Sequence, residues 1–127
     1  MTSLADMLER DWQAQVIQAA RLLGYRHYHT HSSKRSPEGF PDLVLCGRRV
    51  VFVELKRDVK ASQPTPKQKE WLTRLHAAGA EVYVARPSML DDLVAVLASP
   101  TWTASQARAR LLAELHHHLT NEKENAA

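Results

Sequence analysis

Three charged residues of this 127-residue chain have types and spacing that suit a metal-binding site. Asp42 opens a short apolar run, and Glu54 and Lys56 end the next one, which starts at Val50. Side chains two residues apart in a strand point the same way, so Glu54 and Lys56 should share a face. The short turn between the runs, residues 47–49, predicts an antiparallel hairpin that brings Asp42 across from this pair.

Two neighbouring carboxylates suit a hard divalent ion, Mg²⁺ or Mn²⁺, which keeps water ligands for a substrate. Such an ion polarises a phosphodiester and activates a bound water, while Lys56 positions that water or offsets developing charge. Glu54 stands among apolar residues, where a bare carboxylate is costly unless it is paired or metal-bound. The alternative is an ion pair of Lys56 with Glu54 or Asp42 that has no catalytic role.

The residues before the hairpin predict a helix, a strand and a loop. An apolar stripe of helical period predicts a helix over residues 3–23, with Ser3 as its N-cap and Gly24 as its stop. Aromatic and β-branched residues predict a strand over residues 25–31. The Ser, Lys, Arg, Pro and Gly content of residues 32–40 predicts a loop.

The residues after the hairpin predict a crossover. Residues 66–78 should form a helix with Thr65 as its N-cap and Gly79 as its stop, followed by a strand over residues 81–85. A strand reached through a helix is parallel to the strand before it.

Two helices should follow the last strand. The first spans residues 87–98, and a capping-box pattern of Thr103 and Gln106 predicts that the second runs to about Leu119. The charged segment 121–127 is expected to be disordered. Both hairpin runs are apolar almost throughout, which predicts strands covered on both faces. The expected class is an α/β sandwich around a mixed sheet of about four strands.

The whole-chain composition permits a nucleic-acid partner. The formal net charge is +3 and the pI about 9.2, and basic residues gather between residues 34 and 69. No apolar run approaches the roughly twenty residues of a transmembrane helix, so no membrane partner is expected. The single cysteine, Cys46, excludes an internal disulfide and favours a reducing, cytoplasmic location, where we expect it buried and inert.

Taken in order, these residues resemble a known nuclease family. Phe40-Pro41-Asp42, then a strand and a turn, then Glu54-Leu55-Lys56 is similar to the PD-(D/E)XK motif. Over about residues 9–86 the chain more narrowly resembles the stand-alone VRR-NUC (virus-type replication-repair nuclease) branch. The segments that carry this resemblance are Glu9 with Trp12-Gln13, Gly39 to Leu43, Phe52 to Lys56, Pro66 to Gln68, and Ala78-Gly79.

The resemblance implies a restriction-endonuclease-like α/β core with added C-terminal helices, in one domain over residues 3–119. It also implies a role for each matching residue. Asp42 and Glu54 would be metal ligands, joined by the Leu55 carbonyl, and Glu9 would complete the metal shell. Lys56 would be the catalytic lysine, and Gln68 would lie beside it. For Glu9 and Gln68 the alternative is a solvated polar side chain.

Other polar and aromatic residues have weaker signals. His27, His29 and His31 alternate on a strand face, but no further ligand by spacing supports a zinc site. The histidines of residues 116–118 run around a helix and are expected to be solvated. The tryptophans Trp12, Trp71 and Trp102 are expected to pack in the core or against the sheet. The residues expected to contact nucleic acid are His29, Ser32, Lys34, Arg35, Lys60 and Lys67.

The implied activity is hydrolysis of DNA by a metal-activated water, leaving a 5′-phosphate and a 3′-hydroxyl. Stand-alone members of the family resemble Holliday junction resolvases, so branched DNA, a homodimer and a phage or bacterial source are expected. Two alternatives stay open: a restriction-type or mismatch-repair-type endonuclease on the same fold, and a non-catalytic DNA-binding module.

Overall fold

A computed structural model describes residues 3–31 and 37–119 of the chain. The predicted tail, residues 121–127, and most of the predicted loop lie outside these described residues. The elements follow in the order η1 (Leu4–Asp6), α1 (Glu9–Leu22), β1 (Arg26–His29), β2 (Leu43–Cys46), β3 (Val50–Leu55), α2 (Pro66–Ala77), β4 (Glu81–Ala85), η2 (Pro87–Met89), α3 (Leu90–Ala98) and α4 (Gln106–His118).

The four strands form one mixed sheet in the order β1-β2-β3-β4. β1 pairs with β2 and β2 with β3 in antiparallel register, and β3 pairs with β4 in parallel. The hairpin and the crossover through α2 are thus confirmed, and so is the α/β class. Among the described helices, none is long and apolar enough to cross a bilayer.

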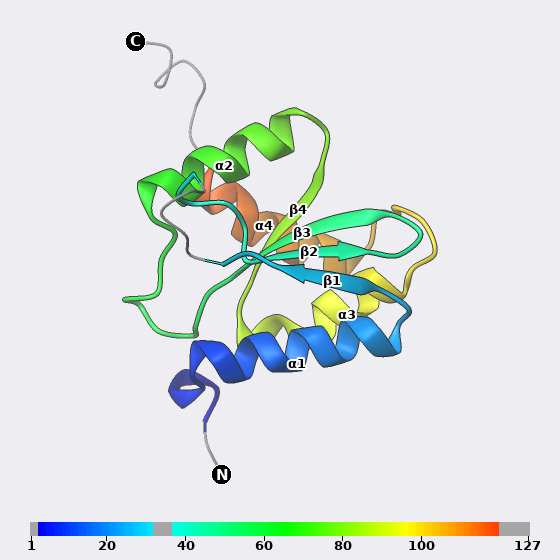
Figure 1. Ribbon diagram of the computed structural model, residues 1–127, viewed down its shortest axis with the longest axis horizontal. Helices are drawn as coiled ribbons and strands as arrows, with labels where there is room; N and C mark the ends of the chain where they lie inside the picture. The colour runs from blue at the N-terminus through cyan, green and yellow to red at the C-terminus, as the bar shows by residue number, and fades with distance from the viewer. Residues whose placement is uncertain (1–2, 32–36, 120–127) are drawn as a thin grey trace.

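The sheet has one fully covered face. Leu43, Leu45 and the odd-numbered residues of β3 point toward α1 and α3, where Trp12 and Val16 complete a buried core. Figure 1 shows α1 and α2 on opposite sides of the sheet. A second cluster joins α2, α4 and β4 through Leu72, Leu115, Val82 and Val84.

The expectation that both hairpin strands are covered on both faces is wrong. Cys46 is exposed, and Val50 is 45% exposed. The physical reason is that α2 connects β3 to β4 and therefore packs over the β4 edge of the sheet. Cys46 lies on the same face of the sheet as α2, but in the part of that face that α2 does not cover, so it is not the buried residue that the sequence predicted.

The helix ends follow local backbone rules more closely than the helix starts. Gly24 adopts φ +90° after α1, and the N–H of Tyr25 donates to the carbonyl of Ala20, which confirms the predicted stop. Ser3 does not cap α1, because its hydroxyl donates to Asp6 at 2.7 Å and the helix begins at Glu9.

The predicted start of α4 is also wrong. Ser105, two residues after Thr103, is the N-cap, and its hydroxyl accepts from the N–H of Arg108 at 3.1 Å. Trp102 does not pack against the sheet. The residue is 56% exposed, and its ring centroid lies 4.6 Å from the Arg108 guanidinium carbon on α4.

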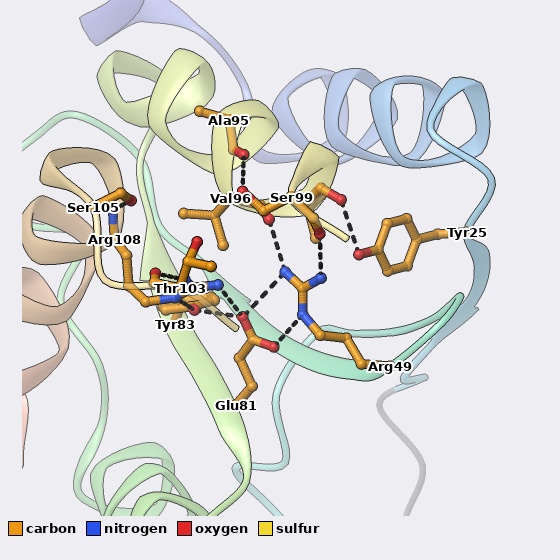
Figure 2. A network of polar contacts seen from close by, with 11 residues as sticks. Tyr25, Arg49, Glu81, Tyr83, Ala95, Val96, Ser99, Thr103, Ser105 and Arg108 are labelled. Carbon is orange, nitrogen blue, oxygen red and sulfur yellow. Dashed lines mark hydrogen bonds and ion pairs between the residues drawn. The ribbon is translucent and has the colours of Figure 1, made fainter. Parts of the chain in front are cut away.

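A buried polar network lies at the end of the sheet where β3 and β4 begin (Figure 2). Glu81 accepts from Arg49 Nε at 2.6 Å, from the Tyr83 hydroxyl at 2.5 Å and from Arg108 Nη2 at 3.0 Å. Arg49 also donates to the Val96 carbonyl at 2.7 Å at the end of α3. Burial alone would raise the pKa of Glu81, but the donors from Arg49, Tyr83 and Arg108 outweigh it and hold the pKa below its ordinary value. Arg49 is therefore a structural residue and not part of an exposed basic surface.

Candidate active site

Asp42 and Glu54 lie across from each other at the other end of the hairpin. In the antiparallel register Leu43 pairs with Val53. One step further along the ladder, Asp42 comes opposite Glu54. The Asp42 carboxylate accepts a hydrogen bond from the backbone N–H of Leu55 at 2.8 Å. The structure thus brings the two carboxyl groups to one end of the sheet, where the hairpin predicts them.

The side chain of Glu54 is unusual for a residue in a strand. It is 0% exposed, and within the described part of the chain no N–H or hydroxyl group donates to either carboxyl oxygen. Burial raises the pKa of Glu54 from its ordinary 4.5 to about 10, helped by a hydrogen bond that the protonated form donates to Asp42 and by the negative charge of Asp42. A buried carboxyl group without a partner is costly, and a bound cation would remove that cost.

Two further charged groups act on Glu54 from different elements. Lys56, half-buried two residues further along the chain, opposes the rise in the pKa of Glu54. Glu9, the first residue of α1, is exposed, and its negative charge adds to the rise. The other three charged residues named from the sequence, Asp42, Lys56 and Glu9, thus each act electrostatically on Glu54.

Contacts between distant segments hold α1 beside the end of β3. The Arg57 Nε donates to the carbonyl of Met7, just before α1, at 3.0 Å. The indole N–H of Trp12 donates to the Ala85 carbonyl at 3.1 Å, and the backbone N–H of Lys56 donates to the same oxygen at 3.1 Å. No sequence pattern indicates the Arg57 contact. Trp12 is confirmed as a core residue, with 0% exposure.

The segment before Asp42 is positioned by close backbone packing. Gly39 adopts φ +92°, and a Cβ there would lie 2.5 Å from the Lys67 carbonyl carbon and 2.7 Å from the Gln68 nitrogen. Only glycine fits this approach to the first turn of α2. The ring of Phe40 then packs edge-on against Trp71, with centroids 5.0 Å apart.

Thr30 is a supporting residue that sequence reasoning missed. Its hydroxyl donates to the Pro41 carbonyl at 2.7 Å, and its backbone N–H donates to the Asp42 carbonyl at 2.9 Å. The two bonds continue the pairing of β1 and β2 by one residue and hold the backbone of Asp42. A threonine at the end of a predicted strand carries no signal for this role.

Gln68 is placed in a helix cap. Its side-chain oxygen accepts from the N–H of Thr65 at 2.8 Å, and the Thr65 hydroxyl accepts from the N–H of Gln68 at 3.2 Å. The predicted N-cap at Thr65 is confirmed. The described bonds of the Gln68 side chain serve the start of α2, so a role beside Lys56 stays a prediction.

The residues predicted to contact nucleic acid are spread over several elements. His29 lies opposite Leu43 in β1, and strand alternation places it on the α1 side of the sheet, away from the face of Glu54. Lys60 and Lys67 are exposed. Ser32, Lys34 and Arg35 lie outside the described residues.

The loop after Lys56 is held by Arg86. Its guanidinium donates to the Ser62 carbonyl at 2.8 Å and to the Glu114 carboxylate at 2.8 Å. The same carboxylate lies 3.1 Å from Nε2 of His118. His118 is only 5% exposed, so the prediction that all three terminal histidines are solvated is wrong for this residue.

The donors at this end of the sheet fit a hard divalent ion. No group of three or more His, Cys, Asp or Glu side chains among the described residues forms a ready-made metal cage. Mg²⁺ is usually held by one or two carboxylates and several waters, and does not need such a cage. Asp42 opposite the unpartnered, buried Glu54 supplies two hard oxygen donors of this kind.

Two solved structures are similar to this chain. One, described as a VRR_NUC domain, is 29% identical, with a TM-score of 0.58 over 68% of this chain and 94% of that one. Another, described as a VRR_NUC domain protein, is 22% identical, with a TM-score of 0.57 over 72% of this chain and 85% of that one, and shows the fold alone. Neither a protein-family model nor a curated protein matches the sequence.

Proposed function

Because the chain has the restriction-endonuclease-like fold of a VRR-NUC domain, a nuclease-type domain, we propose that it is a metal-dependent endonuclease that hydrolyses DNA phosphodiester bonds. The single observation that carries this proposal is Glu54. A fully buried carboxyl group to which no donor of the described residues bonds, across from Asp42 and two residues from Lys56, is costly in a structural role and suited to a metal ligand.

Asp42 and Glu54 would hold Mg²⁺ or Mn²⁺. The Leu55 carbonyl is a third candidate, because the N–H and C=O of a strand residue point to the same side and the Leu55 N–H donates to Asp42. When bound, the ion would supply Lewis-acid polarisation of the phosphodiester and a water acidic enough to act as nucleophile. Glu9, exposed at the start of α1, would complete the set through the outer part of the ion's shell.

Lys56 has a separate task. This half-buried lysine acts on Glu54, and its ammonium would lie beside the scissile phosphate, where it would offset the charge that develops in the transition state. The exposed Lys60 and Lys67 would contact backbone phosphates and contribute to affinity without reading sequence. A branched DNA substrate, a homodimer and an intracellular location belong to the same proposal.

Cleavage of a labelled four-way junction and a matched duplex, each with Mg²⁺, Mn²⁺ or EDTA, tests this function. We expect metal-dependent cutting that falls at least about a hundredfold in Asp42→Ala, since the ion would lose a ligand. Asp91→Ala, at an exposed aspartate on α3, is the matched control and should cut normally.

Lys56→Ala separates catalysis from binding. It should lose cutting while its affinity for DNA, measured in EDTA, stays close to that of the wild type. A wild-type protein that binds DNA but cuts none of these substrates in either metal would overturn the nuclease proposal and leave a DNA-binding module.

A further inference from the structure

The face of the sheet that carries the carboxyl groups continues into an uncovered surface. Val44 lies two residues after Asp42 in β2, so its side chain is on the same face, about 7 Å further along. Tyr28 in β1 is the cross-strand partner of Val44, and its side chain is 64% exposed. An exposed tyrosine ring therefore lies one row of the sheet away from Asp42.

The next row of the same face is also exposed. Arg26 pairs with Cys46, and Cys46 pairs with Val50. All three are exposed, and Val50 is 45% exposed. Phe52, which pairs with Val44 and ends the first row, is half-buried against Phe40. We call the other five residues of these two rows, of which only Val44 is half-buried, the open face: Arg26, Tyr28, Val44, Cys46 and Val50.

The open face is apolar and carries positive charge only. None of its five residues is acidic, Arg26 lies within it, and the exposed Arg48 follows in the adjoining turn. The opposite side of β1 is different, because His27 and His29 are half-buried on the side of α1. An exposed apolar patch with a cationic border is typical of an interaction surface, and its charge is complementary to a polyanion.

We propose that the open face binds an unpaired strand of DNA, with a nucleobase stacked on Tyr28 and a backbone phosphate on Arg26. The inference rests on the proposed nuclease function, since it extends the path of the substrate strand from the carboxyl groups. Strand residues two apart are about 7 Å apart, so the face offers successive contacts along an extended chain. Proteins that bind single strands combine such aromatic platforms with cations.

The proposal names a substrate class. Bases within a duplex are already stacked on their neighbours, so Tyr28 can only engage a base that is unpaired. Substrates with unpaired nucleotides next to the cut, such as flaps, gaps and open branch points, should therefore bind more tightly than an intact duplex.

Binding in EDTA tests the proposal without requiring cleavage. The probes are a fluorescent oligothymidylate and an abasic strand of the same length, followed by anisotropy. Tyr28→Ala should weaken binding of the oligothymidylate about fivefold or more and leave the abasic strand unchanged. Tyr28→Phe keeps the ring and should restore binding. Leu22→Ala, at an 81% exposed apolar residue of α1, is the matched control.

Arg26→Ala should weaken both probes and lower the salt dependence by about one phosphate contact, while Arg21→Ala on α1 should not. Wild-type affinities in Tyr28→Ala for both probes would overturn the proposal. Sedimentation of the same variants provides a second decision: a loss of dimer with unchanged DNA binding would assign the open face to a second copy of the chain. If the wild-type protein shows no metal-dependent cutting but the variants show these binding differences, only the nuclease function is overturned.

Discussion

Two glutamates with buried side chains in neighbouring parallel strands have pKa values shifted in opposite directions. Glu81 at the start of β4 accepts hydrogen bonds from two arginines and a tyrosine, and its pKa lies below the ordinary value. Glu54 near the end of β3 receives no hydrogen bond from any donor in the described part of the chain, and its pKa rises to about 10. Burial acts in the same direction on both residues, so the difference comes from the donors around them.

The contrast separates a structural carboxylate from a candidate functional one. At the Glu81 end, the charges of Arg49 and Arg108 are satisfied within the chain, which leaves nothing for a ligand to do. At the Glu54 end, the chain leaves a carboxyl group uncompensated and places Asp42 across from it. We expect a cation-binding site to contain a carboxyl group without a compensating donor, and we expect a stabilising network to be fully paired.

The largest expected effect comes from breaking the Glu81 network. Glu81→Gln would leave the buried guanidinium of Arg108 without its carboxylate, because Arg108 is 1% exposed. We expect the free energy of unfolding to fall by about 3–5 kcal/mol at neutral pH, measured by urea denaturation. Glu70→Gln, at an exposed pair with Arg74, should change little. Equal stability of these two variants would refute the structural role of Glu81.

A smaller effect should follow from Gly39→Ala, which tests the backbone packing at the Glu54 end. The new Cβ would overlap the backbone of Lys67 and Gln68 at a positive φ, which should cost about 2–4 kcal/mol of stability and slow cleavage. Gly79→Ala has a similar φ of +88° but open space around it, and should cost only about 1–2 kcal/mol without slowing cleavage. Identical costs would show that packing against α2 does not matter.

The smallest expected effect is a pH dependence of the free energy of unfolding that is due to Glu54. In the unfolded chain Glu54 loses its proton near pH 4.5, whereas in the folded chain it keeps the proton until about pH 10. The unfolded state therefore binds fewer protons between these values, and the stability of the metal-free protein should fall as pH rises. The slope due to this group should be at most about 1.4 kcal/mol per pH unit.

Glu54→Gln isolates this contribution, because glutamine cannot lose a proton. The difference in unfolding free energy between wild type and variant should grow from pH 5 to pH 8 in favour of the variant. Burial lowers the pKa of His118 below its ordinary 6.5, so this residue acts in the opposite direction, but its contribution cancels in the difference. A constant difference would mean that Glu54 is ionised in the folded chain.

Local signals account for the parts of the fold that were predictable. The hairpin, the crossover and the glycine stops each depend on a few adjacent residues, and all are confirmed. The start of α1 was not predictable, because the stripe of Leu4, Leu8 and Trp12 continues through the break between η1 and Glu9. Coverage of the second sheet face depends on where α2 packs, which no local pattern specifies.

The candidate site divides in the same way. Asp42, Glu54 and Lys56 belong to one hairpin, so strand alternation and a short turn suffice to place them together. Arg57 and Met7 are 50 residues apart, and Trp12 and Ala85 are 73 residues apart. The contacts between these pairs need the folded topology, and composition shows Arg57 only as one more basic residue.

One carbonyl oxygen sets the alignment of the candidate site. The Ala85 oxygen accepts both the indole N–H of Trp12, from the helix of Glu9, and the backbone N–H of Lys56, from the strand of Glu54. Helix α1 and strand β3 are thereby bonded to the same atom, and neither can shift relative to the other without losing a hydrogen bond. The distance between Glu9 on α1 and Glu54 on β3 is thus fixed by a hydrogen bond inside the core. An uncharged residue, Trp12, therefore controls the spacing of the charged ones.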